Sequence, residues 1–431
     1  MTTRTRLFIM MVLEFFIWGA WLPLIFGYLP SLGFSAGEQS LILNAFPVAS
    51  LIGMFFSNQW ADRSPAPERV LAISHLIAGL AILGCGFTRS FLPFFLLMLV
   101  HCLLYVPTIS ITNSIAFANM KNADKEFGIV RMGGTIGWIL AAWPFTFIFV
   151  NWAAVDAAHP QGLVNWLGTA LANPLTGDAA KAATRWTYVV AGIASLALAA
   201  FSLSLPRAKD AGKSSSEGSA WATAFSLLKQ PFILVLWLVT LVDAFVHNLY
   251  FNWTGVFLGT AREAGGVGIA SNWITPVMSI GQIFEILTMF VLGSTLKRLG
   301  WRKTMVVGIL GHAARFAAYA FMPQNTMAII TIQALHGICY AFFFATVYIF
   351  VDAHCPKDIR SSAQGLFNLQ ILGIGVLLAN TLGPYLIQNV YTMNGRTDFH
   401  SLFMVPLGAA LVAVVMLAVF FKPPTEGPQE A

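Results

Sequence analysis

The stretch RAKDAGKSSSEGS, residues 207–219, decides how the rest of the chain is organised. It is rich in charged residues, serine and glycine, a composition typical of a flexible linker. Long apolar stretches lie on both sides of it. We therefore predict an N-terminal six-helix bundle over residues 1–205, a linker over 206–230 and a C-terminal six-helix bundle over 231–431.

The composition of the two halves excludes a soluble protein. Of the 431 residues, 57% are hydrophobic and 10% are charged, whereas a soluble domain carries about 25% charged residues. The net charge of +6 comes from basic residues scattered in short loops. They indicate membrane topology and predict no nucleic-acid partner. The cysteines have no CxxC spacing, so we expect neither a disulfide framework nor a metal site.

Apolar stretches of spanning length recur along both halves. A transmembrane helix needs about 20 predominantly apolar residues. Twelve stretches meet this requirement, and they cover residues 7–29, 40–61, 70–88, 91–117, 128–150, 185–205, 231–257, 267–296, 303–322, 325–352, 360–388 and 399–421. The sequence therefore predicts an all-α polytopic membrane protein with twelve transmembrane helices.

The distribution of lysine and arginine predicts the orientation of these spans. If the N-terminus is cytoplasmic, 17 of the 24 basic residues lie on the cytoplasmic side and five on the opposite side. The remaining two, Arg131 and Arg315, lie in or near helices. Such an excess favours the side that holds it as the inside. We expect both termini, and the linker, to be cytoplasmic.

Two connections at corresponding places in the halves carry related sequences. GSTLKRLGWRK (293–303) follows the eighth span, and NQWADRSPAPER (58–69) follows the second. The first resembles the G-x-x-x-D-R-x-G-R-[KR] loop of the major facilitator superfamily, with Lys297 where aspartate is usual. The second keeps Asp62 and Arg63 but lacks the glycines. The resemblance implies two pseudo-symmetric bundles with a substrate site between them near the membrane midplane.

Ionisable side chains within the spans are candidates for function, because a charge at the bilayer centre costs about 2.5–3.5 kcal/mol on insertion scales. In PVMSIGQIFEILTMFVL (276–292), Gln282 and Glu285 share one helix face. Arg131, Thr135 and Trp138 share a face of the fifth span. The structural alternatives are a pairing of Glu285 with an arginine of another helix, and extension of Arg131 to lipid headgroups.

Further polar residues lie in the first, seventh and tenth spans. Asp243 and His247, four residues apart, indicate either a proton relay or a local helix-stabilising pair. His336 and Tyr340 have the same spacing, although a single histidine in a bundle is more often a satisfied core residue. Glu14, about two turns into the first span, either titrates or approaches the cytoplasmic interface.

These residue types suit a neutral solute that has hydroxyl groups and a planar ring. A nucleoside has both, and a sugar also fits, because each presents hydroxyls to amide and carboxylate groups. A membrane-embedded enzyme or sensor is an alternative of another class. The chain has no HExxH, GxSxG or P-loop motif and no sizeable extramembrane domain. We therefore expect a transporter that is not an enzyme and that acts as a monomer in the lipid bilayer.

Six stretches, in order along the chain, resemble the bacterial nucleoside:H+ symporters of the major facilitator superfamily. They are EFFIWGAW (14–21), VPTISITNSIAF (106–117), VRMGGTIGWI (130–139), VMSIGQIFEIL (277–287), RFAAYAF (315–321) and IRSSAQGLF (359–367). The resemblance implies nucleoside import across the inner membrane, driven by protons and without another cofactor. It places the substrate-binding positions on Arg131, Thr135, Trp138, Asn248, Gln282, Glu285, His336 and Tyr340.

The chain departs from the family pattern at several of these places. Phe245 replaces a glutamine and His336 a tyrosine. Ala341 stands where the pattern has an aspartate that is a natural candidate for proton coupling. Another group should then titrate, and the candidates are Glu285, Asp243, Glu14 and His336, in that order. A uniporter is the alternative.

Overall fold

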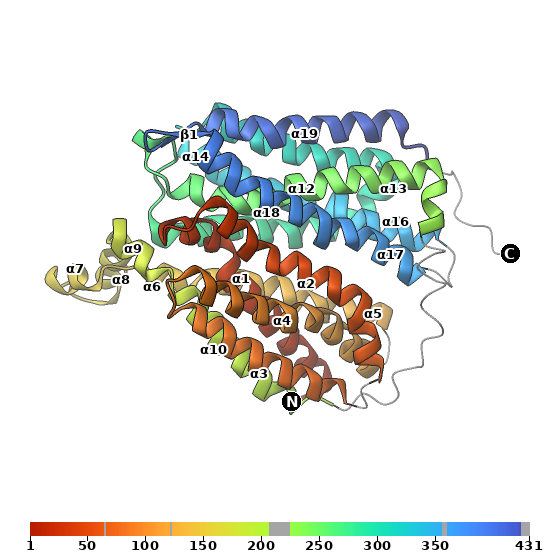
Figure 1. Ribbon diagram of the computed structural model, residues 1–431, viewed down its shortest axis with the longest axis horizontal. Helices are drawn as coiled ribbons and strands as arrows, with labels where there is room; N and C mark the ends of the chain where they lie inside the picture. The colour runs from red at the N-terminus through yellow and green to blue at the C-terminus, as the bar shows by residue number, and fades with distance from the viewer. Residues whose placement is uncertain (64–65, 121–122, 207–224, 356–359, 424–431) are drawn as a thin grey trace. The chain divides into compact units, whose positions relative to one another are not determined.

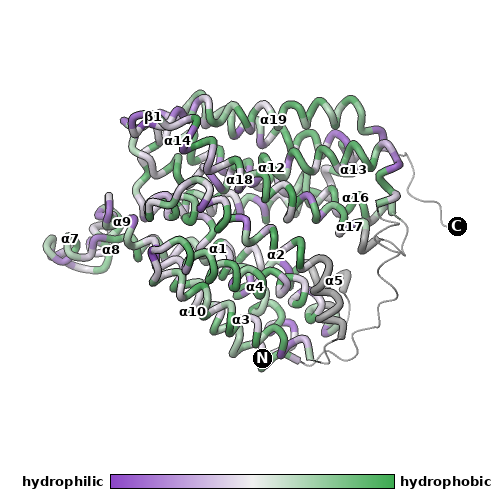
Figure 2. Tube along the Cα trace, viewed as in Figure 1, coloured by the Kyte–Doolittle hydropathy of each residue, from purple (hydrophilic) through white to green (hydrophobic). Residues whose placement is uncertain are grey.

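The protein is a multi-pass membrane protein built almost entirely of helices. Its computed structural model describes residues 1–63, 66–120, 123–206, 225–355 and 360–423. Within these ranges, nine helices are long and apolar enough to cross a membrane. Figure 1 shows the order of the helices, and in Figure 2 the long ones are hydrophobic along most of their length.

The chain forms two compact units. Unit 1 contains residues 1–212 and 251–279, and unit 2 contains residues 213–250 and 280–431. Two long helices, α12 (Pro231–Gly259) and α13 (Ile274–Phe321), contribute residues to both units. Most of the predicted linker, residues 207–224, lies outside the described part of the chain, so the predicted domain limits stay a prediction.

Unit 1 contains five consecutive long helices from the N-terminus, and a sixth long helix follows after several short ones. The helices of residues 1–205 are α1 (Thr3–Ser31), α2 (Ala36–Arg63), α3 (Pro67–Cys85), α4 (Phe91–Asn119), α5 (Ala123–Ala142), α6 (Pro144–Ile148), α7 (Trp152–Ala157), α8 (Leu163–Ala172), α9 (Gly177–Ala183) and α10 (Trp186–Ser202). Helix α3 packs against both α4 and α10. The span predicted for 128–150 is interrupted, because Pro144 cannot continue the hydrogen bonding of α5.

The long connection predicted between the fifth and sixth spans has helical structure of its own. Helices α7, α8 and α9 form a small group at one end of unit 1 (Figure 1). The group mixes hydrophilic and hydrophobic residues along its trace (Figure 2). The rings of Trp152 and Trp166 stack within it, with centroids 5.6 Å apart. Two short 3-10 helices of unit 1, η2 (Arg262–Ala264) and η3 (Ser271–Trp273), lie between α12 and α13.

Unit 2 contains several helices that change their winding. Its further elements are η1 (Leu227–Lys229), α14 (Thr326–Thr331), η4 (Ile332–Ala334), α15 (Leu335–Cys339), η5 (Tyr340–Ala345), α16 (Thr346–His354), α17 (Arg360–Asn368), η6 (Leu369–Ile374), α18 (Gly375–Tyr385), η7 (Leu386–Val390) and α19 (Phe399–Phe420). Three of these, η5, η6 and η7, are π-helical. Segments of this kind within α-helices frequently mark functional sites.

Helix α13 covers most of two predicted spans, 267–296 and 303–322. Its backbone leaves the helical conformation at Gly300, where φ is 71° and ψ is 175°. This conformation is essentially restricted to glycine. Gly300 lies in the stretch GSTLKRLGWRK, so the turn between the eighth and ninth spans is found where the sequence places it.

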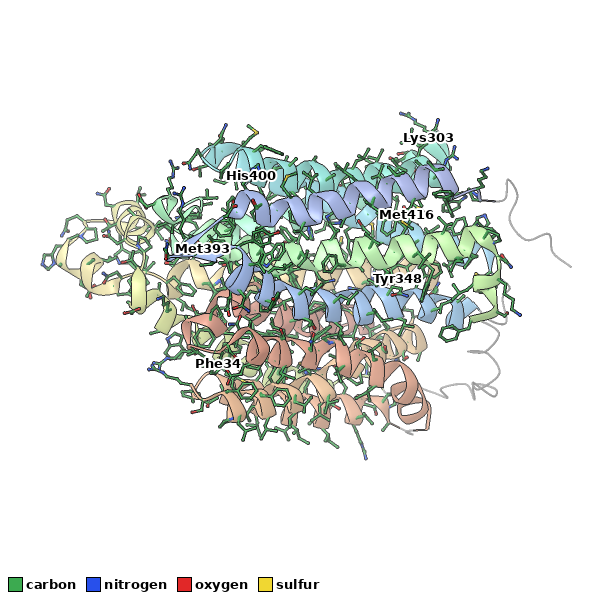
Figure 3. The ribbon with its side chains drawn as sticks, turned by 45° about the horizontal axis from the view of Figure 1, so that its top comes forward. Phe34, Lys303, Tyr348, Met393, His400 and Met416 are labelled. Carbon is green, nitrogen blue, oxygen red and sulfur yellow. The ribbon has the colours of Figure 1, made fainter. Side chains whose placement is uncertain are left out.

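A small hairpin departs from the predicted all-α fold. Strands β1 (Thr392–Met393) and β2 (Arg396–Thr397) pair antiparallel. They are joined by Asn394 and Gly395, whose φ values of 52° and 74° are typical of a type I′ turn. Figure 3 places Met393 and His400 at one end of unit 2 and Lys303 at the other. This separation agrees with the prediction that these two regions face opposite sides of the membrane.

A charged cap begins the last helix, directly after this hairpin. The backbone N–H of Ser401 donates to the carboxylate of Asp398 over 3.1 Å. Hydrogen bonding from the side chain and backbone of Ser401 lowers the pKa of Asp398. A negative charge at this position also interacts favourably with the N-terminus of α19.

Glycines allow α1 and α5 to approach each other closely in unit 1. A Cβ atom on Gly137 would overlap the carbonyl oxygen of Val12. A Cβ on Gly133 would lie 2.8 Å from the carbonyl oxygen of Phe8. Gly133 and Gly137 are one turn apart, and this small-xxx-small spacing is typical of tightly packed membrane helices. The contact fixes α5, and with it Arg131, against α1.

We expect Gly137→Ala to destabilise unit 1, because the added methyl group meets backbone that cannot rotate away. Overpacking of this kind costs about 1–3 kcal/mol. Gly168→Ala in α8 is the matched control, since a Cβ at that position meets open space. Thermal unfolding of the purified variants in detergent measures the difference. Equal unfolding temperatures would show that the α1–α5 contact does not limit stability.

Candidate functional site

A buried arginine organises the polar groups of unit 2. The guanidinium of Arg315, on α13, donates from Nη1 to Nδ1 of His336 over 3.0 Å and from Nη2 to Nδ1 of His312 over 2.9 Å. It also lies 3.9 Å above the ring centroid of Tyr250. All of these side chains are buried. Arg315 therefore holds two imidazoles and an aromatic ring in one arrangement.

The contacts of Arg315 determine where the two histidines carry their hydrogens. A guanidinium can only donate hydrogen bonds, so Nδ1 of His312 and of His336 must accept. Each ring, when neutral, then carries its hydrogen on Nε2. This assignment follows from the hydrogen-bond network. It makes Nε2 of His336 a hydrogen-bond donor.

Asp243 faces His312 and not its helix neighbour His247. Its Oδ2 lies 3.7 Å from Nε2 of His312, beyond hydrogen-bond distance. Neither carboxylate oxygen has a hydrogen-bond partner among the described residues, and the side chain is fully buried. The ring of His247 instead stacks on His336, with centroids 5.0 Å apart. Asp243 and His247, predicted as either a proton relay or a local helix-stabilising pair, therefore share no hydrogen bond among the described contacts.

A second line of hydrogen bonds extends from the ring that Arg315 covers. The hydroxyl of Tyr250 donates to Oε1 of Gln333 over 3.3 Å. Nε2 of Gln333 donates to the hydroxyl of Tyr319 over 2.7 Å. All three side chains are buried. This line connects α12, η4 and α13, so it fixes the helices around the arginine.

Close packing brings the predicted pair Gln282 and Glu285 beside α15. A Cβ atom on Gly281 would lie 2.7 Å from Cβ of His336, and one on Gly337 would overlap the backbone of Phe284 and Glu285. Glycine at both positions lets α13 and α15 touch along their backbones. The amide and carboxylate of α13 thus lie within one turn of these contacts with the histidine helix.

The remaining predicted residues of unit 2 offer polar atoms and rings around this contact. Gln282 is buried, and its Oε1 has no hydrogen-bond partner among the described residues. Glu285 and Tyr340 are half-buried. The ring of Tyr340 lies 6.3 Å from that of His247 and begins the π-helical segment η5. Asn248 donates from Nδ2 to the carbonyl oxygen of Ala244 over 2.7 Å.

The predicted face of α5 belongs to unit 1. Arg131, Thr135 and Trp138 lie on this helix and are half-buried. The guanidinium of Arg131 lies 4.2 Å from the ring centroid of Phe15. The ring of Trp138 meets Trp18 edge to face, with centroids 5.2 Å apart. The α5 face is thus held against aromatic residues of α1.

Glu14 is buried within unit 1. Its carboxylate lies 3.0 Å from Nε2 of His75 and accepts a hydrogen bond from Thr108. Of the two alternatives predicted for Glu14, titration or an approach to the cytoplasmic interface, neither is tested by its burial, although the side chain has no exposed area. Hydrogen-bond partners from α3 and α4 satisfy it inside the bundle.

Sequence reasoning did not select His75, Ser195, His312 or Arg315 as site residues. The available signal was an ionisable side chain within an apolar stretch, which applies to His75, His312 and Arg315. Ser195 carries no such signal. His75, Ser195 and Arg315 have partners on other helices, which local spacing does not identify, whereas the His312–Arg315 contact lies within α13.

The polar constellations lie on a chain whose relatives are transporters. The sequence profile of a family described as nucleoside H+ symporter matches residues 1–172 and 161–426. The chain belongs to the nucleoside H+ symporter family. YegT of Escherichia coli K12 is 29% identical over 434 residues, which cover 98% of this chain and 94% of YegT. Nucleoside permease NupG of the same organism is 24% identical, with 98% and 96% covered.

Solved structures support the fold expected of this family. The crystal structure of nucleoside transporter NupG has a TM-score of 0.79 at 23% identity and covers 98% of this chain and 100% of that one. A D-xylose–proton symporter has a TM-score of 0.69 at 14% identity, with 98% of each chain covered. The major facilitator fold and the resemblance to nucleoside symporters are therefore confirmed.

We expect Arg315→Lys to lower both stability and substrate binding in this family member. An ammonium group cannot donate to His312 and His336 at once in the fork geometry of a guanidinium. The loss of one hydrogen bond from a charged group costs about 1.5–3 kcal/mol. Thermal unfolding in detergent, with and without uridine, measures the loss of stability and the loss of uridine binding. Arg302→Lys, at an exposed position, is the control. Matching behaviour of the two variants would contradict the organising role of Arg315.

Proposed function

We propose that this transporter imports nucleosides across the bacterial inner membrane together with protons, by alternating access of its two bundles. The proposal rests on the family match and on one observation within unit 2. The buried Oε1 of Gln282 has no hydrogen-bond partner among the described residues, while α13 contacts the helix that carries His336. A buried acceptor of this kind is suited to receiving a hydrogen from a ligand, since buried polar atoms are rarely left unpaired.

In this proposal, each residue of the unit 2 constellation has a distinct role. Gln282 and Glu285 accept hydrogen bonds from ribose hydroxyls. Asn248 and Nε2 of His336 contact polar atoms of the ribose or base. Tyr340 stacks on the base, because an aromatic face suits a planar ring.

The α5 face of unit 1 provides a second set of substrate contacts in the proposal. Arg131 and Thr135 supply a guanidinium and a hydroxyl as hydrogen-bond groups. Trp138 supplies an aromatic face, which Trp18 orients by its edge contact. Substitution of these residues should therefore affect nucleoside transport more than protein stability.

The proposed architecture has twelve transmembrane helices and cytoplasmic termini. Each of the twelve predicted spans contains helix in the described part of the chain. The 17-to-5 distribution of basic residues supports the orientation. We further propose that the protein acts as a monomer in the bilayer, that it is not an enzyme, and that the proton is its coupling ion without another cofactor.

A sugar is the second candidate substrate. The acceptor groups of Gln282 and Glu285 suit the hydroxyls of a sugar as well as those of ribose. The aromatic groups near them, Tyr340 and the stacked His247–His336 pair, favour a solute with a planar base. This arrangement makes the nucleoside the better match.

Uptake into membrane vesicles tests the proposal. We expect labelled uridine or adenosine to accumulate when the outside is made acidic, and to equilibrate only slowly when the pH gradient is collapsed. D-xylose should not compete. Accumulation of D-xylose without nucleoside uptake would establish the sugar alternative. Saturable nucleoside uptake that does not depend on the pH gradient would agree with the proposed substrate but contradict symport.

Gln282→Met should raise the KM for nucleoside by about 3- to 10-fold, because it removes one neutral hydrogen bond while keeping the side-chain volume. The effect should disappear for the deoxynucleoside that lacks the hydroxyl bound by Gln282. Gln230→Met, at an exposed position, is the control. Equal KM values for Gln282→Met and the unmodified protein would remove Gln282 from the substrate site.

A further inference from the structure

A buried acid–base pair in unit 1 has no role in the proposed nucleoside contacts. Glu14 on α1 and His75 on α3 lie with Oε2 and Nε2 3.0 Å apart. On its other side, Nδ1 of His75 lies 3.0 Å from Oγ of Ser195 on α10. The three side chains have no exposed area. Three helices therefore meet at a line of groups that can hold a proton.

The hydroxyl of Ser195 fixes one hydrogen of the imidazole. This hydroxyl donates to the backbone carbonyl oxygen of His75 over 2.9 Å. A serine hydroxyl has a single hydrogen, so toward Nδ1 its oxygen must accept. Nδ1 of His75 consequently carries a hydrogen. The tautomer follows from this count.

The contact between Glu14 and His75 therefore requires one further proton. A neutral ring with its hydrogen on Nδ1 presents a lone pair at Nε2. That lone pair and a carboxylate oxygen repel each other at 3.0 Å unless a hydrogen lies between them. The hydrogen is either on Nε2, giving an ion pair, or on Oε2, giving a neutral pair. In both cases the pair has no net charge.

Helix α4 holds the carboxylate in place for this contact. Oγ1 of Thr108 donates to Oε1 of Glu14 over 2.8 Å and also contacts the carbonyl oxygen of Tyr105. The hydroxyl of Tyr105 donates to the backbone carbonyl oxygen of Glu14 over 2.7 Å. The carboxylate is thus oriented toward His75 from a second side. Such support from neighbouring residues is typical of a functional site.

We propose that the Glu14–His75 pair, oriented by Ser195, is the proton-binding site of this symporter. The proposal rests on the proposed proton-coupled function and assigns its coupling site. A proton from water binds between Oε2 and Nε2, and returns to water when the pair opens. Loaded, the pair is neutral. Unloaded, it carries one negative charge, which is costly in a buried site.

Few other charged or titratable groups face the pair from the described helices packed against it. On α4, His101 stacks on Tyr105 with centroids 5.2 Å apart, and its Nδ1 donates to the carbonyl oxygen of Ala78. On α5, Arg131 lies over Phe15, the neighbour of Glu14. Helix α10 contributes Ser195. Among these groups, Arg131 is the cation.

The pair is connected to the proposed substrate contacts through α1. Glu14 precedes Phe15, which lies under Arg131, and stands one turn before Trp18, which contacts Trp138. A displacement of α1 relative to α3 on proton release would move these aromatic rings with it. Occupation of the proton site and the position of the α5 face are thereby coupled within unit 1.

The Glu14→Gln variant tests the assignment. Its amide can donate to Nε2 of His75 and accept from Thr108, so it mimics the loaded, neutral pair. In proteoliposomes, we expect it to retain uridine counterflow but to lose accumulation driven by a pH gradient, together with the uridine-induced proton movement. Glu263→Gln, the same change at an exposed position, should accumulate uridine. Accumulation by Glu14→Gln with an unchanged pH dependence would overturn the proposal.

Ser195→Ala tests the same assignment of the proton-binding site if Glu14→Gln does not fold. Removal of the acceptor at Nδ1 weakens proton binding, so the pH midpoint of proton-driven uptake should shift downward by about one unit. An unshifted midpoint would overturn the assignment. Absence of uridine-dependent proton movement in the unmodified protein would instead overturn the proposed symport. If both variants retain proton-coupled uptake, the proton-binding site lies elsewhere in the protein.

Discussion

The structure depends on one constraint, that an ionisable group buried at membrane depth must meet partners inside the protein. Neither lipid nor bulk water can satisfy it there. Arg315 meets this requirement through two imidazoles and an aromatic face. Glu14 meets it through His75 and Thr108. In both cases at least one partner comes from another helix, so satisfaction of the group also specifies how the helices pack.

Close packing is what allows these partners to reach each other. Gly137 brings α5 onto α1 in unit 1, and Gly337 brings α15 onto α13 in unit 2. Where backbones touch, short side chains such as Ser195 and Thr108 can reach across to a neighbouring helix. Small residues at helix contacts, with polar groups bonded between helices, are the general means by which membrane helices associate.

The two polar clusters differ in chemistry. In unit 2, Arg315 forces His312 and His336 to accept at Nδ1, so both rings act as oriented neutral groups. That arrangement suits recognition of a neutral, hydrogen-bonding solute. In unit 1, Ser195 forces His75 to donate at Nδ1, and the ring then shares a proton with Glu14. In our proposals, the hydrogen-bond partners thus give the same residue type a substrate-binding role in unit 2 and a proton-binding role in unit 1.

The sequence by itself determined the class of protein, the main helices and several polar residues of interest. Hydropathy and length are local properties, so the apolar stretches were found where helices occur, and Gly300 turned the chain within its predicted connection. Helix spacing likewise placed Arg131, Thr135 and Trp138 together on α5. The break at Pro144 was missed because it lies inside a long apolar stretch, and the hairpin at Asn394 was missed because strands of two residues are too short to show a strand pattern.

Only the tertiary structure decided which groups share a proton or a hydrogen bond. Spacing paired Asp243 with His247, whereas the fold places Asp243 opposite His312. His75 and Ser195 are separated by 120 residues and meet only because α3 packs on α10. Contacts between helices depend on how side chains fill the bundle in three dimensions. A one-dimensional pattern shows that a buried charge needs a partner, but the packing determines which partner it receives.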